Sequence, residues 1–246
     1  MFFQYLEIIT FKILPLITYI VFVLGIVLKL SSWVKRTYTI STKNNVLPLQ
    51  KLTLPIILQS LLSTILRYVL QFKLLRSSYK LWVVSWIAFH IPILFIIFGH
   101  LRGFGIWSLE WFTWIASKEF LAYILPTILG VMVMVALVTI LVYRLIYLRP
   151  ISSLGNYIVL FLLILVITSG DLMRFSSFTL EEKIIVIPPG FTLRLEHTPN
   201  ISLLVLHSIL VQVLVMYIPF SPLLHIYTSP FLMIVNELKR IRMSES

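Results

Sequence analysis

Apolar residues occur in five runs of about 20 along the chain, and short polar or charged stretches separate them. A run of that length crosses the roughly 30 Å hydrocarbon core of a bilayer as an α-helix. The predicted spans are 8–30, 81–101, 120–148, 156–173 and 201–227. The pattern therefore predicts an all-α fold, a polytopic membrane protein whose five transmembrane helices form one bundle and a single membrane domain, 1–246.

A sixth apolar stretch, 52–72, is nearly long enough to span. The polar side chains in its interior are Gln59, Ser60, Ser63, Thr64 and Arg67, and basic residues flank both ends. These features favour an amphipathic helix on the cytoplasmic surface over a sixth span. At the start of the chain, Met1–Lys12 lacks a basic n-region and a signal cleavage site, so we expect the first apolar run to remain as a span.

Composition and charge refine this topology. The chain is 59% hydrophobic and 12% charged, with a net charge of +11 and a mean hydropathy of +1.01. If the start lies outside, the inside segments hold 14 basic and 2 acidic residues, and the outside segments hold 6 and 7. This distribution predicts an outside N-terminus and a cytoplasmic C-terminus in a multi-pass protein of the cell membrane. The basic excess is then explained by orientation and contact with anionic lipid or a cytoplasmic partner, with no need for nucleic acid.

Histidine is the strong iron ligand that this chain offers. The sequence contains no cysteine, which excludes disulfides, thiolate ligation of haem, iron–sulfur clusters held by this chain and covalent haem attachment. Four of the five histidines lie in two predicted spans, His90 and His100 in the second, His207 and His225 in the fifth. One histidine in a membrane helix usually makes an interhelical hydrogen bond. Four, on two helices of opposite direction, favour joint ligation of haem.

Antiparallel helices would bring His100 opposite His207 and His90 opposite His225, so that each pair could bind one haem iron at its own depth. The spacings of ten and eighteen residues differ by roughly 12 Å of helix. Helix tilt, inclined haem planes and a kink at Pro219 and Pro222 can absorb that difference.

Other polar positions have an ordinary interpretation beside a functional one. Ser208 is one possible acceptor for the second ring nitrogen of a ligating histidine, and Thr228 is another. Gly99 permits either helix packing or close approach of a haem ring. Lys118 either snorkels to the interface or contacts a quinol headgroup. The polar residues from Ser169 to Asn200 are predicted to form the longest outer loop.

The histidine stretches also carry a family resemblance. The motifs are Phe89-His90-Ile91, Ile93-Leu94, Phe98-Gly99-His100, Pro219-Phe220-Ser221, Leu224-His225-Ile226 and Ser229-Pro230, followed by a basic tail. On these motifs, residues 79–243 resemble the gamma subunit of membrane-bound respiratory nitrate reductase, a di-haem cytochrome b. The sequence departs from the family pattern at Pro92, in the longer apolar region 31–80 and in the outer loops.

The resemblance implies two haem b groups, the outer one bound by His100 and His207 and the inner one by His90 and His225. It also implies a quinol site near the outer haem, to which Gly99, His100 and Lys118 correspond. The implied partners are a cytoplasmic iron–sulfur subunit and a catalytic molybdenum subunit.

Together these observations predict an electron-transfer subunit of a quinol-oxidising oxidoreductase complex. With histidine in both axial positions of each iron, no site is left for substrate chemistry, so the expected role of the haems is electron transfer. Related cytochromes of sulfur-metabolising, heterodisulfide reductase-like or hydrogenase complexes are an alternative. A membrane transporter or permease is an alternative of another class, which predicts discontinuous helices and inverted repeats. A structural membrane anchor would leave the four histidines unexplained.

Overall fold

The computed structural model describes residues 2–44, 54, 55, 58, 62, 78–101, 114, 118, 120–176, 183–188, 190–195 and 200–224. The predicted amphipathic helix at 52–72 lies outside these residues apart from four isolated positions, so it remains a prediction.

The described elements follow one another in three groups. The first is α1 (Phe2–Ile8), the π-helix η1 (Ile9–Ile13) and α2 (Leu14–Asn44). The second is α5 (Tyr79–Trp82), the π-helix η4 (Val83–His90), α6 (Ile91–His100), the π-helix η5 (Phe120–Ile124), α8 (Leu125–Ile146) and the 3₁₀ turn η6 (Arg149–Ile151). The third is α9 (Leu154–Phe175), β1 (Lys183–Ile187), β2 (Phe191–Leu195), α10 (Ile201–Tyr217) and the 3₁₀ turns η7 (Ile218–Phe220) and η8 (Pro222–Leu224).

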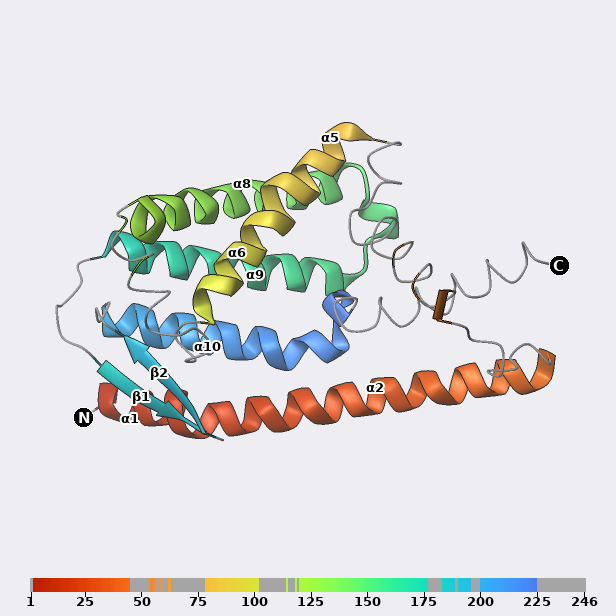
Figure 1. The fold of residues 1–246 in the computed structure, drawn as a ribbon, viewed down its shortest axis with the longest axis horizontal. Coiled ribbons are helices and arrows are strands. Elements are labelled where there is room, and N and C mark those ends of the chain that lie inside the picture. Colours follow the sequence, from red (N-terminus) through yellow and green to blue (C-terminus); the bar gives the residue numbers. More distant parts are fainter. Residues whose placement is uncertain are drawn as a thin grey trace. The chain divides into compact units, whose positions relative to one another are not determined.

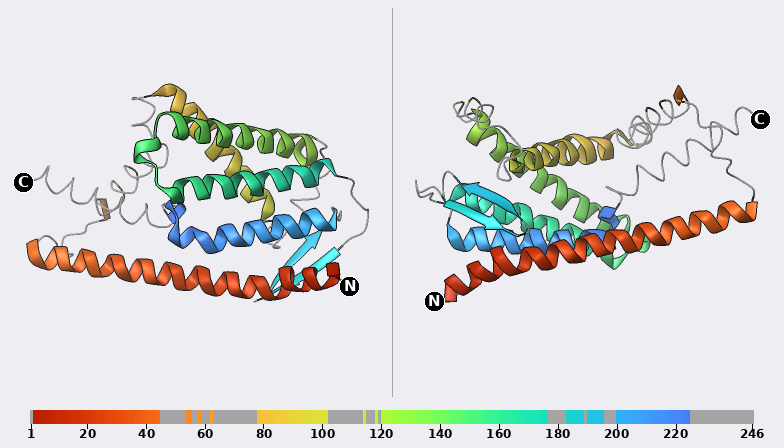
Figure 2. Two further views of the ribbon diagram at one scale, coloured as in Figure 1. Left: turned by 180° about the vertical axis from the view of Figure 1, so that it is seen from behind. Right: turned by 60° about the horizontal axis from the view of Figure 1, so that its bottom comes forward.

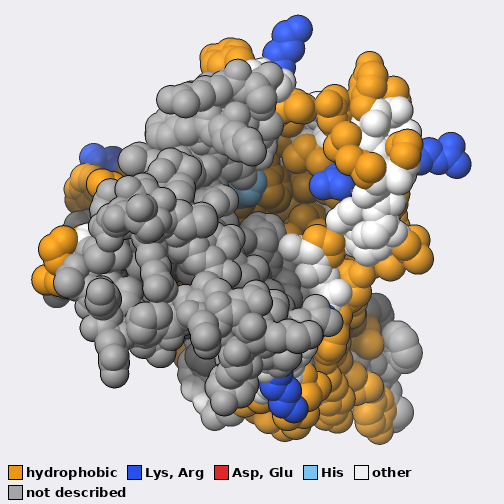
Figure 3. Space-filling view, turned by 90° about the vertical axis from the view of Figure 1, so that its right-hand side faces the viewer, with side chains coloured by type: hydrophobic (Ala, Val, Ile, Leu, Met, Phe, Trp, Pro, Cys, Tyr) orange, Lys and Arg blue, Asp and Glu red, His pale blue; other side chains and the backbone are white. Residues whose placement is uncertain are grey.

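Five helical stretches in the described part are long and apolar enough to cross a membrane: Gln4–Ser32, Tyr79–His100, Leu125–Ile146, Leu154–Phe175 and Ile201–Phe220. The predicted five-helix membrane fold is thereby confirmed. Many large apolar side chains on these helices are exposed, and Figure 3 shows hydrophobic side chains over most of the described surface on one face. Such a surface suits hydrocarbon and not water.

The chain divides into two compact units, residues 1–21 with 83–217 and residues 22–82 with 218–246. In the first unit, α8, α9 and α10 lie side by side, and the helix 83–100 packs across α8 and α9 (Figure 1). The left-hand view of Figure 2 shows the same order of the three helices. The core between them includes Val133 and Leu137 of α8 and Leu160 and Ile167 of α9. This packing brings the ends of α6, α9 and α10 together.

The region between α9 and α10 differs from the predicted long loop that starts at Ser169. Helix α9 continues through Ser169 to Phe175, in agreement with the predicted span 156–173, and the Ser169 hydroxyl donates a hydrogen bond to the Val166 carbonyl of its own helix. The antiparallel hairpin β1–β2 follows, paired from Lys183 with Leu195 to Ile187 with Phe191. Figure 2 shows the hairpin beside the start of α10.

A polar contact joins the first helix to α10. The carbonyl of Thr10 lies in the π-helix η1, where the wider turn leaves backbone groups available to other partners. The Gln212 side chain donates its Nε2 hydrogen to this carbonyl at 3.0 Å, and Thr18 Oγ1 donates to Gln212 Oε1 at 3.4 Å. Hydrogen bonds between membrane helices stabilise a particular packing, so Gln212 sets the position of α10 against the first helix.

The fifth span is shorter as an α-helix than predicted. Regular helix α10 ends at Tyr217 and continues as the turns η7 and η8, where a kinked helix through 227 was expected. Pro219 has no N–H and disfavours helical geometry at the residue before it, which explains the end of the helix. Within the second unit, a Cβ on Gly25 would lie 2.6 Å from Pro219 Cβ, so glycine is required for this close approach.

Candidate functional site

His100 and His207 lie against each other in the first unit. His100 is the last residue of α6, and His207 lies in the second turn of α10. Their ring centroids are 6.3 Å apart, and the two ring planes differ by 29°. Two metal–nitrogen bonds of about 2 Å each, plus roughly 1.1 Å from each nitrogen to its ring centre, would separate trans imidazoles by about 6 Å. The observed separation therefore suits two imidazoles on opposite sides of one metal ion.

The hydrogen bond of His100 determines which of its nitrogens can bind a metal. Nδ1 of His100 lies 2.7 Å from the carbonyl oxygen of Ile96, one turn earlier in α6. A carbonyl oxygen only accepts hydrogen bonds, so Nδ1 carries the proton and donates it. The lone pair is then on Nε2, the nitrogen available as a metal ligand.

Ser169 of α9 orients His207 in a similar way. Its hydroxyl lies 3.0 Å from His207 Nδ1 and 2.9 Å from the Val166 carbonyl, and the residue is only 3% exposed. Since Val166 O must accept, the hydroxyl donates to it and accepts the hydrogen of His207 Nδ1. These two hydrogen bonds leave the lone pair of His207 on Nε2. A ligating histidine usually has a hydrogen-bonded second nitrogen of this kind.

Gly170 provides the space for the His207 ring. A Cβ at this position would lie 3.3 Å from His207 Cε1 and 3.7 Å from Nδ1. The α9 backbone therefore forms a wall against which the imidazole packs. Sequence reasoning missed Ser169 and Gly170 and proposed Ser208, because it considered only serine and threonine residues near the histidines in the two histidine-bearing spans. A small polar residue followed by glycine near the end of an apolar helix was the available signal.

His90 lies at the end of the π-helix η4 and is half-buried. Its Nδ1 donates to the Ser85 carbonyl at 2.6 Å, so His90 has the same tautomer as His100. Trp86 stacks on the imidazole with ring centroids 5.4 Å apart, and Phe89 meets it edge-on at 5.1 Å. The predicted partner, His225, lies outside the described residues, as does Thr228. The pairing of His90 with His225 therefore remains a prediction.

The two predicted quinol-site residues other than His100 are both exposed. A Cβ on Gly99 would meet no atom within 4 Å, so the space at this position of α6 is open. The Lys118 side chain is exposed, and its carbonyl accepts a hydrogen bond from Leu121 N at the start of η5. No contact between Lys118 and either His100 or His207 is found among the described residues.

The donor set limits which metal centre fits this site. Among the described residues, no group of three or more His, Cys, Asp or Glu side chains could hold a metal ion. Protein zinc sites need three or four such ligands. A metal bound by the His100–His207 pair must therefore bring its own equatorial ligands, as the four nitrogens of a porphyrin do. The apolar surroundings agree with a hydrophobic cofactor.

A sequence profile of the nitrate reductase gamma subunit matches residues 73–244, which is well over half of the chain and includes all four span histidines. The chain belongs to the nitrate reductase gamma subunit family. A search of curated proteins finds no match.

Membership in the nitrate reductase gamma family identifies a membrane cytochrome b subunit of a nitrate reductase. Members of this family contain haem and act together with the other nitrate reductase subunits. Family membership and the five apolar helices agree on a multi-pass membrane protein. The tautomers of His100 and His207, the spacing of their rings and the room left by Gly170 are compatible with the haem of this family.

Proposed function

We propose that this chain is a di-haem b subunit that oxidises quinol and passes the electrons to a cytoplasmic iron–sulfur subunit, and through it to a molybdenum-containing catalytic subunit. The observation that carries the proposal is the His100–His207 pair, 6.3 Å apart with both Nδ1 atoms hydrogen-bonded. His100 and His207 would bind the outer haem, and His90 and His225 the inner haem. A haem with two histidine ligands supplies one-electron transfer and no vacant site for substrate.

The residues around the proposed outer haem have different roles. His100 and His207 bind through Nε2, while Ile96 O and Ser169 keep the two rings oriented. Gly170 keeps the second ring close to α9. The open space at Gly99 and the exposed side chain of His100 leave room for a quinol headgroup that arrives from the lipid, and Lys118 is proposed as a cation that contacts it. The charge distribution predicts that this end faces outside, so protons from quinol would be released there.

A reduced-minus-oxidised spectrum of the purified protein tests the proposal. We expect the absorbance of b-type haem, with two haems per chain by quantitative haem extraction. Addition of a reduced quinol analogue should reduce both. A protein that contains no haem b after expression in a haem-sufficient host would contradict the proposal. Co-purification with iron–sulfur and molybdenum subunits would test the partners.

Ser169→Ala tests the orientation of His207. Because the imidazole loses its hydrogen-bond acceptor, it becomes a weaker electron donor to iron, and we expect the midpoint potential of the outer haem to rise. Loss of such a partner typically costs about 10–100-fold in metal affinity or activity. A redox titration of each haem measures the effect.

Ser208→Ala is the matched control, since Ser208 adjoins His207 in sequence but no hydrogen bond joins the two in the described structure. Equal effects of the two variants, or no effect of Ser169→Ala, would show that Ser169 does not act on the ligand.

A further inference from the structure

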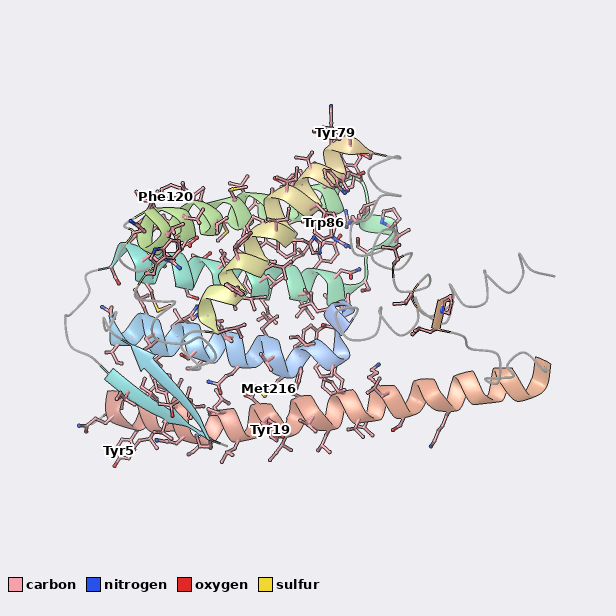
Figure 4. All side chains as sticks on the ribbon, in the orientation of Figure 1. Tyr5, Tyr19, Tyr79, Trp86, Phe120 and Met216 are labelled. Atoms are coloured by element: carbon pink, nitrogen blue, oxygen red, sulfur yellow. The ribbon has the colours of Figure 1, made fainter. Side chains whose placement is uncertain are left out.

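The indole nitrogen of Trp86 is a buried hydrogen-bond donor without an acceptor. Trp86 is 8% exposed, and Figure 4 shows its side chain directed from η4 into the side of the bundle that α8 and α9 form. Its Nε1 has no hydrogen-bond partner in the described structure. A buried tryptophan N–H is usually paired, because leaving it unpaired after removal from water is unfavourable. A bound cofactor that carries a hydrogen-bond acceptor would explain why the Trp86 N–H is buried without a protein partner.

The position of Trp86 indicates which group that is. Trp86 precedes His90 by four residues, and the two rings stack at 5.4 Å with planes 29° apart. The tryptophan therefore lies directly beside the imidazole that is proposed to bind the inner haem. Trp86 would therefore be one of the side chains next to a haem held by His90. The hydrogen-bond acceptors at the rim of a haem b are its two propionate carboxylates.

The depth of Trp86 agrees with a carboxylate partner. In the predicted orientation, Trp86 is one turn closer to the cytoplasmic end of its helix than His90. Charged carboxylates are unfavourable in hydrocarbon and turn toward the aqueous side. Tyr79 and Trp82, whose rings stack at 6.4 Å, mark the membrane interface one to two turns further along the same helix.

We propose that Trp86 binds the inner haem by donating its Nε1 hydrogen to a propionate while its ring stacks on His90. This proposal rests on the proposed function, because it requires a haem at His90. Trp86 then has two effects on the cofactor. Its hydrogen bond partly neutralises a carboxylate charge near the iron, and its ring restricts rotation of the ligating imidazole.

Trp86→Phe separates these effects, since phenylalanine keeps an aromatic ring but has no N–H. The experiment uses the haem-loaded protein purified from membranes, with Trp82→Phe as the matched control. We expect Trp86→Phe to lower the midpoint potential of the inner haem, because the unneutralised carboxylate favours ferric iron, and to shift the propionate band in resonance Raman spectra. The outer haem should not change, and Trp82→Phe should change neither haem.

An inner-haem potential and a propionate band that both stay at their wild-type values in Trp86→Phe would overturn the proposal. If Trp86→Phe loses the inner haem, wild-type protein loaded with haem dimethyl ester, which lacks the carboxylates, should lose it too. Normal binding of the ester at the inner site would then overturn the proposal. Wild-type protein without any haem b would instead contradict the proposed function, so the two failures are distinguishable.

Discussion

Replacement of His100 by alanine is expected to remove the outer haem, leave the inner haem in place and lower quinol oxidation by at least about 100-fold. His100 is one of two imidazoles that face each other at 6.3 Å, and the described residues around it offer no third ligand group that could substitute. A haem held by His207 alone would have lost one of its two proposed protein ligands and would be less firmly positioned. The haem content should fall from two per chain to one, as measured by extraction and by redox titration.

His197→Ala is the control for this experiment, because His197 lies between the predicted spans, beside Glu196. It should keep both haems and full quinol oxidation. The proposed pairing would be wrong if His100→Ala retained two haems with unchanged potentials. It would also be wrong if His100→Ala removed the inner haem and left the outer one, since His100 would then belong to the other site.

Substitution of Gly170 by leucine is expected to have nearly as large an effect, although Gly170 itself binds nothing. A Cβ there already lies 3.3 Å from His207 Cε1, and leucine adds three more carbon atoms in the same direction. The backbone of α9 cannot move away easily, because α9 packs against both α8 and α10. The His207 ring must rotate, which breaks its hydrogen bond to Ser169 and moves Nε2 away from the His100 side. We expect most of the outer haem to be lost.

A graded series at this position separates displacement of the ring from general misfolding. Gly170→Ala requires a shift of only a few tenths of an ångström and should retain the outer haem with an altered electron paramagnetic resonance signal. Leucine is a better helix former than glycine, so the helix itself should be more stable in Gly170→Leu. Circular dichroism should therefore show unchanged helix content in both variants. Two haems with wild-type signals in Gly170→Leu would contradict the role assigned to Gly170.

Both experiments assume that α6 and α10 provide the two imidazoles and that α9 positions one of them, and the sequence shows only the first of these two features. His100 and His207 are conspicuous because ionisable side chains are rare in apolar spans, and opposite helix directions suggest that they meet. Ser169 and Gly170 are small residues in a third helix without histidine, and a serine followed by glycine near the end of that helix is only a weak local signal. Their contact with His207 is visible only when α9 is packed against α10, which places the serine hydroxyl 3.0 Å from His207 Nδ1.

The sequence by itself determined the membrane class, the five spans and the candidate ligands, because hydrocarbon imposes length and apolarity on each crossing helix separately. Those constraints are local, so they can be read along one segment at a time. The tertiary structure alone decided that Ser169 of α9 forms a hydrogen bond with His207 of α10 and that the His207 ring packs on Gly170. These features depend on hydrogen bonds and van der Waals contacts between residues far apart in the chain, and hydropathy carries no information about such partners.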